Sequence, residues 1–219
     1  MTNNNNSAID YKSEIARKSI HLFSLSIPIG YYFLTKEQAL TVLVPLTLFA
    51  LIMDFGRYYS KTLGLLVYSV FGFMLREHEK DLKKKNLSGA SYVFLSAVLV
   101  ILLFPKIFVI TGFTILIISD ISAALYGRKF GKHKFLFKSL EGTLAFFVTA
   151  SLVVLFSPKI SNLPMEYIIG IIAAAFGAIA ENISYGWADD NFTIPISVCG
   201  IMWLLYSWLL PGLNVYHLG

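Results

Sequence analysis

The sequence predicts an all-α protein: a polytopic membrane bundle of about seven transmembrane helices plus one interfacial or re-entrant helix. Hydrophobic residues make up 56% of the 219 residues and charged residues only 14%, and the mean hydropathy is +0.67. A soluble domain of this size carries more charge, so a bilayer must cover much of the surface. The apolar residues also form long runs, and most Lys and Arg residues lie between those runs.

Seven stretches approach the roughly 20 apolar residues that a spanning helix needs. They are residues 15–35, 38–57, 88–104, 107–126, 140–157, 165–183 and 192–210. The third and fourth stretches, and likewise the fifth and sixth, have short connectors, which predicts helical hairpins. The apolar stretch 63–75 has only 13 residues, so we expect an interfacial or re-entrant helix there.

The chain is predicted to form one transmembrane domain, residues 10–219, after a disordered polar tail, residues 1–9. The first apolar run follows Arg17 and Lys18 as in a signal peptide, but no small-x-small cleavage site comes after it, so we expect it to be retained. The single cysteine, Cys199, excludes an intrachain disulfide.

The basic residues predict the orientation. With seven spans and a cytoplasmic N-terminus, only Lys36, Lys106 and Lys159 of the 18 Lys and Arg residues lie outside. That bias matches the positive-inside rule. The net charge of +5 therefore indicates orientation in the membrane, and we expect no nucleic-acid partner.

Carboxylates and amides gather on the same cytoplasmic side. Charges at membrane depth cost about 2.5–3.5 kcal/mol each on insertion scales and are functional candidates by default. The residues concerned are Asp54, Asp120, Glu141, Glu181, Asp189, Asp190 and Asn191. The outer side carries only Glu37 and Glu166. We therefore expect the active site at the cytoplasmic face.

Glu14, Arg17, Lys18 and His21 are spaced to lie on one helix face. The bases fit simple anchoring at the inner interface equally well. His21, however, lies one turn deeper than an anchor requires, which favours a stripe that faces a site. A lone membrane histidine can also be a hydrogen-bonded packing residue.

The central segment begins with Asp120, Ala123, Ala124 and Gly127, which share one helix face. Small residues on that face let another group approach Asp120 closely. The spacing of Gly127 and the following bases is one residue short of a P-loop, and His133 stands where a P-loop has Ser or Thr.

The second half of this segment contains Arg128, Gly131, Lys138 and Ser139, with the last two at the predicted start of a helix. Backbone N–H groups at a helix N-terminus favour phosphate, and bases neutralise it. A carboxylate near bound phosphates usually indicates a divalent cation. The alternative, a basic cytoplasmic loop with hinge glycines, does not account for Asp120 and Glu141 on either side of the bases.

A third set contains Glu181-Asn182, Asp189-Asp190-Asn191 and Pro195. A helix N-cap with matched charge accounts for Asn191 and partly for Asp190. It leaves Glu181 without a role, so a functional interpretation is favoured.

These residues resemble the CTP-dependent lipid kinases, which comprise dolichol kinase, phytol kinase and the yeast-type diacylglycerol kinase and are distantly related to phosphatidate cytidylyltransferases. Three motifs carry the resemblance, and together they span residues 14–195. They are Glu14-x-x-Arg17-Lys18-x-x-His21; Asp120-x-x-Ala123-x-x-x-Gly127-x-x-x-Gly131 with Lys138-Ser139-x-Glu141-Gly142; and Glu181 with Asp190-Asn191 and Pro195.

The resemblance implies transfer of the γ-phosphoryl group of CTP to the hydroxyl of a membrane lipid alcohol, with Mg²⁺ or another divalent cation. The alcohol would be a polyprenol or dolichol, phytol or diacylglycerol. Arg17, Lys18, Asp120 and Gly127 fall on positions that this family needs for activity. The chain lacks the extra N-terminal helices of eukaryotic dolichol kinases, which leaves the choice of alcohol open.

The expected roles divide into three groups. Asp120 and Asp190, helped by Glu141 and Glu181, would hold the metal. Arg17, Lys18, Arg128 and Lys138 would hold the triphosphate, with backbone access at Gly127, Gly131 and Ser139. Asp189 and His21 are the candidates for the base.

Two other functions stay open. A cytidylyltransferase that makes CDP-lipid would share the CTP and metal site, although its acidic, glycine-rich signature is missing here. A small ion-coupled transporter would also bury carboxylates, but near the midplane and often on interrupted helices.

Overall fold

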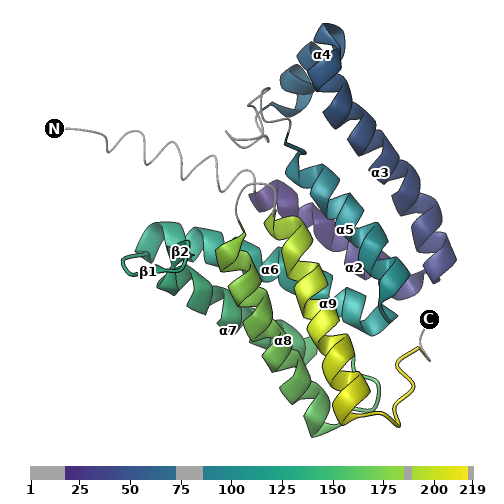
Figure 1. The fold of residues 1–219 in the computed structure, drawn as a ribbon, viewed down its shortest axis with the longest axis vertical. Coiled ribbons are helices and arrows are strands. Elements are labelled where there is room, and N and C mark those ends of the chain that lie inside the picture. Colours follow the sequence, from purple (N-terminus) through teal and green to yellow (C-terminus); the bar gives the residue numbers. More distant parts are fainter. Residues whose placement is uncertain (1–17, 73–85, 185–188, 217–219) are drawn as a thin grey trace.

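The computed structural model describes residues 18–72, 86–184 and 189–216, and these form helices joined by loops and one short hairpin (Figure 1). The all-α prediction is confirmed. Residues 18–22 are helical and lead into a 3₁₀ helix, η1 (Phe23–Leu25). The α-helices are α2 (Ser26–Phe33), α3 (Lys36–Tyr59), α4 (Lys61–Phe71), α5 (Gly89–Leu103), α6 (Lys106–Phe130), α7 (Leu140–Phe156), α8 (Pro164–Ile183) and α9 (Asp190–Leu209). The strands are β1 (Lys134–Phe135) and β2 (Lys138–Ser139).

Each predicted span coincides with helical structure over its described residues. Four helices, α3, α6, α8 and α9, are long and apolar enough to cross a bilayer. Helices α5 and α7 are apolar but have only 15 and 17 residues, below the length of about 20 that spans comfortably. These four helices indicate a membrane protein, and the count of seven spans stays a prediction.

The predicted interfacial stretch 63–75 corresponds to α4, which has 11 residues and is too short to span. Residues 73–75 of that stretch lie outside the described part, as does the predicted tail, residues 1–9.

Polar caps explain where the helices begin. Thr35 and Gln38 form a capping box at the start of α3, with each side chain bonded to the other residue's backbone N–H. Ser60 ends α3 and caps α4 through the N–H of Leu63. Ser88 caps α5 in the same way. The helix boundaries therefore follow from local residues as well as from hydrophobicity.

Helix α6 is the centre of the bundle and packs against α2, α7 and α9 (Figure 1). Its contact with α7 is close because two glycines face each other. A Cβ added to Gly142 would lie 3.1 Å from the carbonyl oxygen of Ala123 and 3.3 Å from Cα of Gly127. The predicted small-residue face after Asp120 is thus occupied, toward its C-terminal end, by a neighbouring helix.

Successive helices run in opposite directions, so their connectors fall at two ends of the bundle (Figure 1). One end holds the α2–α3, α5–α6 and α7–α8 connectors, with Lys36, Lys106 and Lys159. The opposite end holds the β1–β2 hairpin, the end of α8 and the start of α9. The polar motifs converge at this second end.

Candidate functional site

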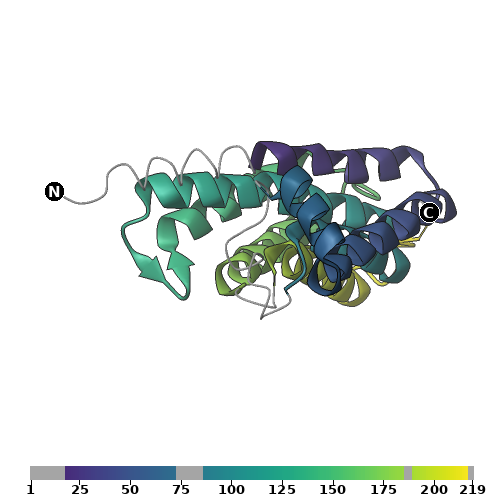
Figure 2. The ribbon, with the colours of Figure 1, turned by 90° about the horizontal axis from the view of Figure 1, so that it is seen from above.

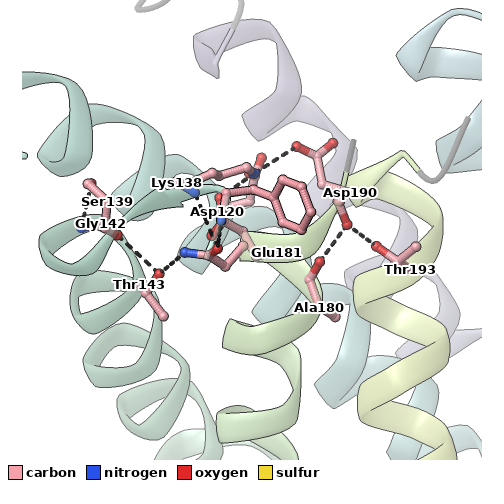
Figure 3. Close-up of polar contacts among 12 residues, drawn as sticks. Asp120, Lys138, Ser139, Gly142, Thr143, Ala180, Glu181, Asp190 and Thr193 are labelled. Carbon is pink, nitrogen blue, oxygen red and sulfur yellow. Dashed lines mark hydrogen bonds and ion pairs between the residues drawn. The ribbon is translucent and has the colours of Figure 1, made fainter. Parts of the chain in front are cut away.

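Lys138, on strand β2, lies among carboxylates from three helices (Figure 3). Its Nζ donates a hydrogen bond of 2.5 Å to Oε1 of Glu181, at the end of α8. The same nitrogen lies 3.9 Å from Oδ2 of Asp190, the first residue of α9. Burial by itself would lower the pKa of Lys138, but the negative charges of Asp190, Glu181 and Asp120 outweigh it and raise the pKa. Lys138 is therefore held as a cation that neutralises a strongly acidic site.

A second ion pair, which is buried on both sides, joins Lys18 to Asp120 of α6. The two side chains are only 5% and 3% exposed, so both charges are removed from solvent and depend on each other. His21, one turn after Lys18, places Nε2 3.8 Å from Oδ2 of Asp120. The described part of the N-terminal stripe thus lies against Asp120, and the prediction that the stripe faces a functional site stays a prediction.

Asn182 fixes the position of Lys138. It is fully buried at the end of α8, and its Oδ1 accepts hydrogen bonds from the backbone N–H groups of Phe137 and Lys138 at 3.0 and 3.3 Å. Its Nδ2 donates to Oγ1 of Thr143 on α7 at 2.6 Å. One amide therefore connects the hairpin to both α7 and α8.

The sequence pattern predicts no role for Asn182 or Thr143. The available signal was an amide in the last turn of an apolar helix, directly beside Glu181. Such a group needs buried hydrogen-bond partners, but the sequence does not identify them.

Ser139 packs closely against Gly127 and Gly131, the two glycines predicted to give the triphosphate access to the backbone. The Ser139 side chain accepts a hydrogen bond from the N–H of Gly142 at 3.2 Å and caps α7. A Cβ on Gly127 or Gly131 would lie 3.0 or 2.8 Å from Ser139 Oγ. Packing alone therefore accounts for both glycines, and their role in nucleotide access stays a prediction. Arg128 is exposed on the last turn of α6.

Asp189 caps helix α9. Its Oδ1 accepts hydrogen bonds from the backbone N and the Nδ2 of Asn191, at 2.9 and 2.8 Å. Thr193 donates to the Asp189 carbonyl at 3.2 Å and shares a 2.5 Å hydrogen bond with Ser184, which follows α8. These bonds hold the end of α8 against the start of α9 and so position Glu181 beside Asp190. The predicted role of Asp189 as a base is not needed to explain its burial.

Two of the acidic residues that the sequence grouped together have partners of their own. Glu141 accepts a 2.7 Å hydrogen bond from Nδ1 of His133 and two longer bonds from the His133 backbone N–H. Asp54 accepts from the backbone and side chain of Ser88 and from Ser91 at 2.5–2.8 Å. Glu141 thus fastens the start of the hairpin, and Asp54 holds α5 against α3.

The structure therefore brings together residues from all three sequence motifs. They are Lys18, His21, Asp120, Lys138, Glu181 and Asp190. Arg17 lies outside the described residues. Within the described ranges, no three His, Cys, Asp or Glu side chains form a group that could hold a metal ion by themselves.

The donor set still fits Mg²⁺, because that ion is usually bound by one or two carboxylates together with substrate phosphates and water. Asp120, Glu181 and Asp190 are buried carboxylates. Lysines are among their partners in this structure.

The chain is 32% identical over 196 residues to the uncharacterized protein RP860 of Rickettsia prowazekii (strain Madrid E). The aligned region covers 87% of this chain and 93% of the relative. No protein-family model matches the chain. No solved structure matches it either.

Proposed function

This chain belongs to the family of the Rickettsia prowazekii protein RP860, and we propose that it is a membrane kinase that transfers the γ-phosphoryl group of CTP to the hydroxyl of a lipid alcohol. The observation that carries the proposal is the pairing of three buried carboxylates with the buried Lys18 and the half-buried Lys138 at one end of the bundle. Lys18 pairs with Asp120, and Lys138 pairs with Glu181 and Asp190.

These pairs supply both charges that a metal–triphosphate complex needs. The lysines can move to phosphate oxygens, and the carboxylates they release can bind Mg²⁺. The exchange conserves charge, so neither partner is left buried and uncompensated, which would be costly. Three carboxylates meet two lysines here, one carboxylate more than simple ion pairing requires.

The roles follow from position. Asp120 and Asp190, with Glu181, would hold Mg²⁺, and the ion would neutralise charge on the β- and γ-phosphates. Glu141 is a more remote helper, since it is bonded to His133. Lys18 and Lys138 would bind phosphate oxygens, joined by Arg128 and, by the resemblance, Arg17. Phosphoryl transfer demands mainly such positioning and charge neutralisation.

In the reaction, the lipid hydroxyl oxygen forms a bond to the γ-phosphorus, and the bond from that phosphorus to the β–γ bridging oxygen breaks. CDP leaves, and the hydroxyl proton passes to a base. His21 is better placed for this than Asp189, because His21 lies 3.8 Å from Asp120 whereas Asp189 is used as a helix cap. The acceptor would arrive from the surrounding bilayer.

The alternative, a CDP-lipid-forming cytidylyltransferase, could use the same residues for CTP and metal. A transporter is less favoured, because Glu181 and Asp190 lie at the ends of α8 and α9, although Asp120 lies near the middle of α6. The nucleotide product separates the three functions: CDP from a kinase, pyrophosphate from a cytidylyltransferase, and neither from a transporter.

The experiment uses purified full-length protein in detergent with CTP and Mg²⁺. Phytol, a polyprenol and diacylglycerol are offered separately, and phosphatidate is offered in parallel. We expect CDP to form in step with one phosphorylated alcohol. Pyrophosphate release with phosphatidate would support the cytidylyltransferase, and no nucleotide turnover with any lipid would refute the kinase.

A further inference from the structure

The β1–β2 hairpin has an unusual tip. The strands pair Lys134 with Ser139 and Phe135 with Lys138, which leaves a two-residue loop of Leu136 and Phe137. Leu136 has a φ of 50°, a left-handed conformation that is costly for a bulky residue. Loops of this length usually carry Asn or Gly at such positions. The apolar side chains at the tip therefore need an explanation other than turn geometry.

The tip side chains point away from the protein core. Phe135, Leu136 and Phe137 are 37%, 51% and 67% exposed. Exposed Lys132, His133 and Lys134 directly precede them. In Figure 2 the hairpin projects beyond the main body of the bundle. Three consecutive apolar side chains next to basic ones are suited to the surface of a lipid bilayer, which has an apolar interior and anionic head groups.

The end of α6 that leads into the hairpin has the composition of a membrane interface. Tyr126 and Phe130 are exposed, and their ring centroids lie 4.6 Å apart. Nζ of Lys129 lies 5.2 Å from the centroid of the Phe130 ring. Helix α6 has 25 residues, and at about 1.5 Å per residue it exceeds a hydrocarbon core of about 30 Å. At least one end of α6 therefore extends to head-group level, and the last turn has the aromatic residues and lysines that concentrate there.

We propose that the hairpin, residues 131–139, docks into the anionic head-group layer of the bilayer that surrounds the protein. Phe135, Leu136 and Phe137 enter the boundary between head groups and acyl chains. Lys132 and Lys134 meet lipid phosphates or carboxylates. Lys and Arg side chains close to a membrane surface are attracted to its anionic lipids.

Docking would also position the candidate site. The N–H groups of Phe137, at the tip, and of Lys138 both bond to Asn182, while the side chain of Lys138 bonds to Glu181. The lipid surface thereby contributes to the placement of Lys138. This inference does not depend on which reaction the site performs.

The test measures where the tip lies, without any assay of activity. Leu136→Cys is made in a Cys199→Ala background, because Cys199 is the single cysteine in the sequence. The thiol receives an environment-sensitive fluorophore, and the protein is reconstituted into phosphatidylcholine vesicles with or without phosphatidylglycerol. Quenching is compared between lipids with nitroxide head groups and a soluble anionic quencher.

We expect head-group nitroxides to quench the fluorophore strongly and the soluble quencher to act weakly, with deeper insertion when phosphatidylglycerol is present. Removing Lys132 and Lys134 together should abolish that dependence on anionic lipid. Asn162→Cys is the matched control, since Asn162 is an exposed turn residue with a φ of 56° at the opposite end. Its label should not respond to phosphatidylglycerol in this lysine-dependent way.

Two results would overturn the proposal. Full access of the soluble quencher to position 136, with no lipid quenching, would place the tip in water and point to a soluble partner. A response to phosphatidylglycerol that persists without Lys132 and Lys134 would show that these bases do not bind the head groups.

Discussion

The Lys18–Asp120 pair allows a structural role to be separated from a functional one. If Asp120 only bound a metal, Asp120→Asn should abolish turnover and leave the protein folded, because the two side chains are nearly isosteric. In the structure, however, Lys18 is 5% exposed and paired with Asp120, so the single substitution leaves a buried ammonium without its counter-charge. We therefore expect Asp120→Asn to destabilise the protein, and Lys18→Met to do so as well.

Removing one partner of a buried ion pair costs about 3–5 kcal/mol, while replacing both with neutral groups is often close to neutral. For a chain of this size, each kcal/mol corresponds to about 2–4 °C in the unfolding midpoint. Each single variant should therefore unfold about 6–20 °C below the wild type. The double variant, Lys18→Met with Asp120→Asn, should recover most of that loss.

The assay uses Cys199, which is fully buried and has a free thiol. A thiol-reactive dye that fluoresces on reaction reports unfolding in detergent during a temperature ramp. Phosphorylation of the lipid alcohol is measured on the same preparations below the midpoint. We expect all three variants to be inactive, including the double variant that has recovered its stability.

Two outcomes would refute this reasoning. If the double variant regained activity together with stability, the pair would serve the fold only. If neither single variant lost stability, the burial of the two charges would carry no energetic weight.

Three further predictions rest on individual contacts. Glu166→Gln should lower the free energy of unfolding by about 3–6 kcal/mol in a thermal unfolding assay. The two Glu166 oxygens accept four hydrogen bonds, and Gln keeps only one accepting oxygen, so two hydrogen bonds to a charged group are lost. An unchanged unfolding midpoint would contradict this. Gly142→Ala should destabilise by about 1–3 kcal/mol by forcing α6 and α7 apart, whereas Gly200→Ala, with open space around the added Cβ, should gain about 0.5–1 kcal/mol in the same assay. Lys138→Ala should raise the half-saturating CTP concentration about 10- to 150-fold through loss of one charged contact; a similar rise from Lys134→Ala, exposed on the same hairpin, would show that only general basic charge matters.

Hydrophobic length and capping residues made most of the fold predictable. The predicted spans 140–157, 165–183 and 192–210 correspond to α7, α8 and α9 with small shifts at their ends. Such segments are recognisable because uninterrupted apolar runs have few other stable forms in a membrane. The number of spans is harder to predict, because α5 and α7 are shorter than a comfortable span, and length alone does not decide whether such helices cross.

Some members of the candidate site were predictable from the sequence, but their pairing was not. Helical spacing put Lys18 and His21 on one face, and the two lie near Asp120 in the structure. The sequence could not show that Lys138 bonds to Glu181 instead of lying free, because that contact spans 43 residues and depends on how α8 packs. Nor could it show that Asp189 would become a helix cap, since a capping carboxylate and a catalytic one look alike in sequence.

The most direct test of the proposed kinase activity follows the phosphorus atoms of CTP into lipid. The purified protein is incubated with Mg²⁺ and the preferred lipid alcohol, once with CTP labelled at the γ-phosphate and once with CTP labelled at the α-phosphate. We expect the γ label to appear in the lipid and the α label to remain in CDP, with ATP a poorer donor than CTP. Transfer of the α label to lipid, or of neither label, would contradict the assignment of this site to phosphoryl transfer from CTP.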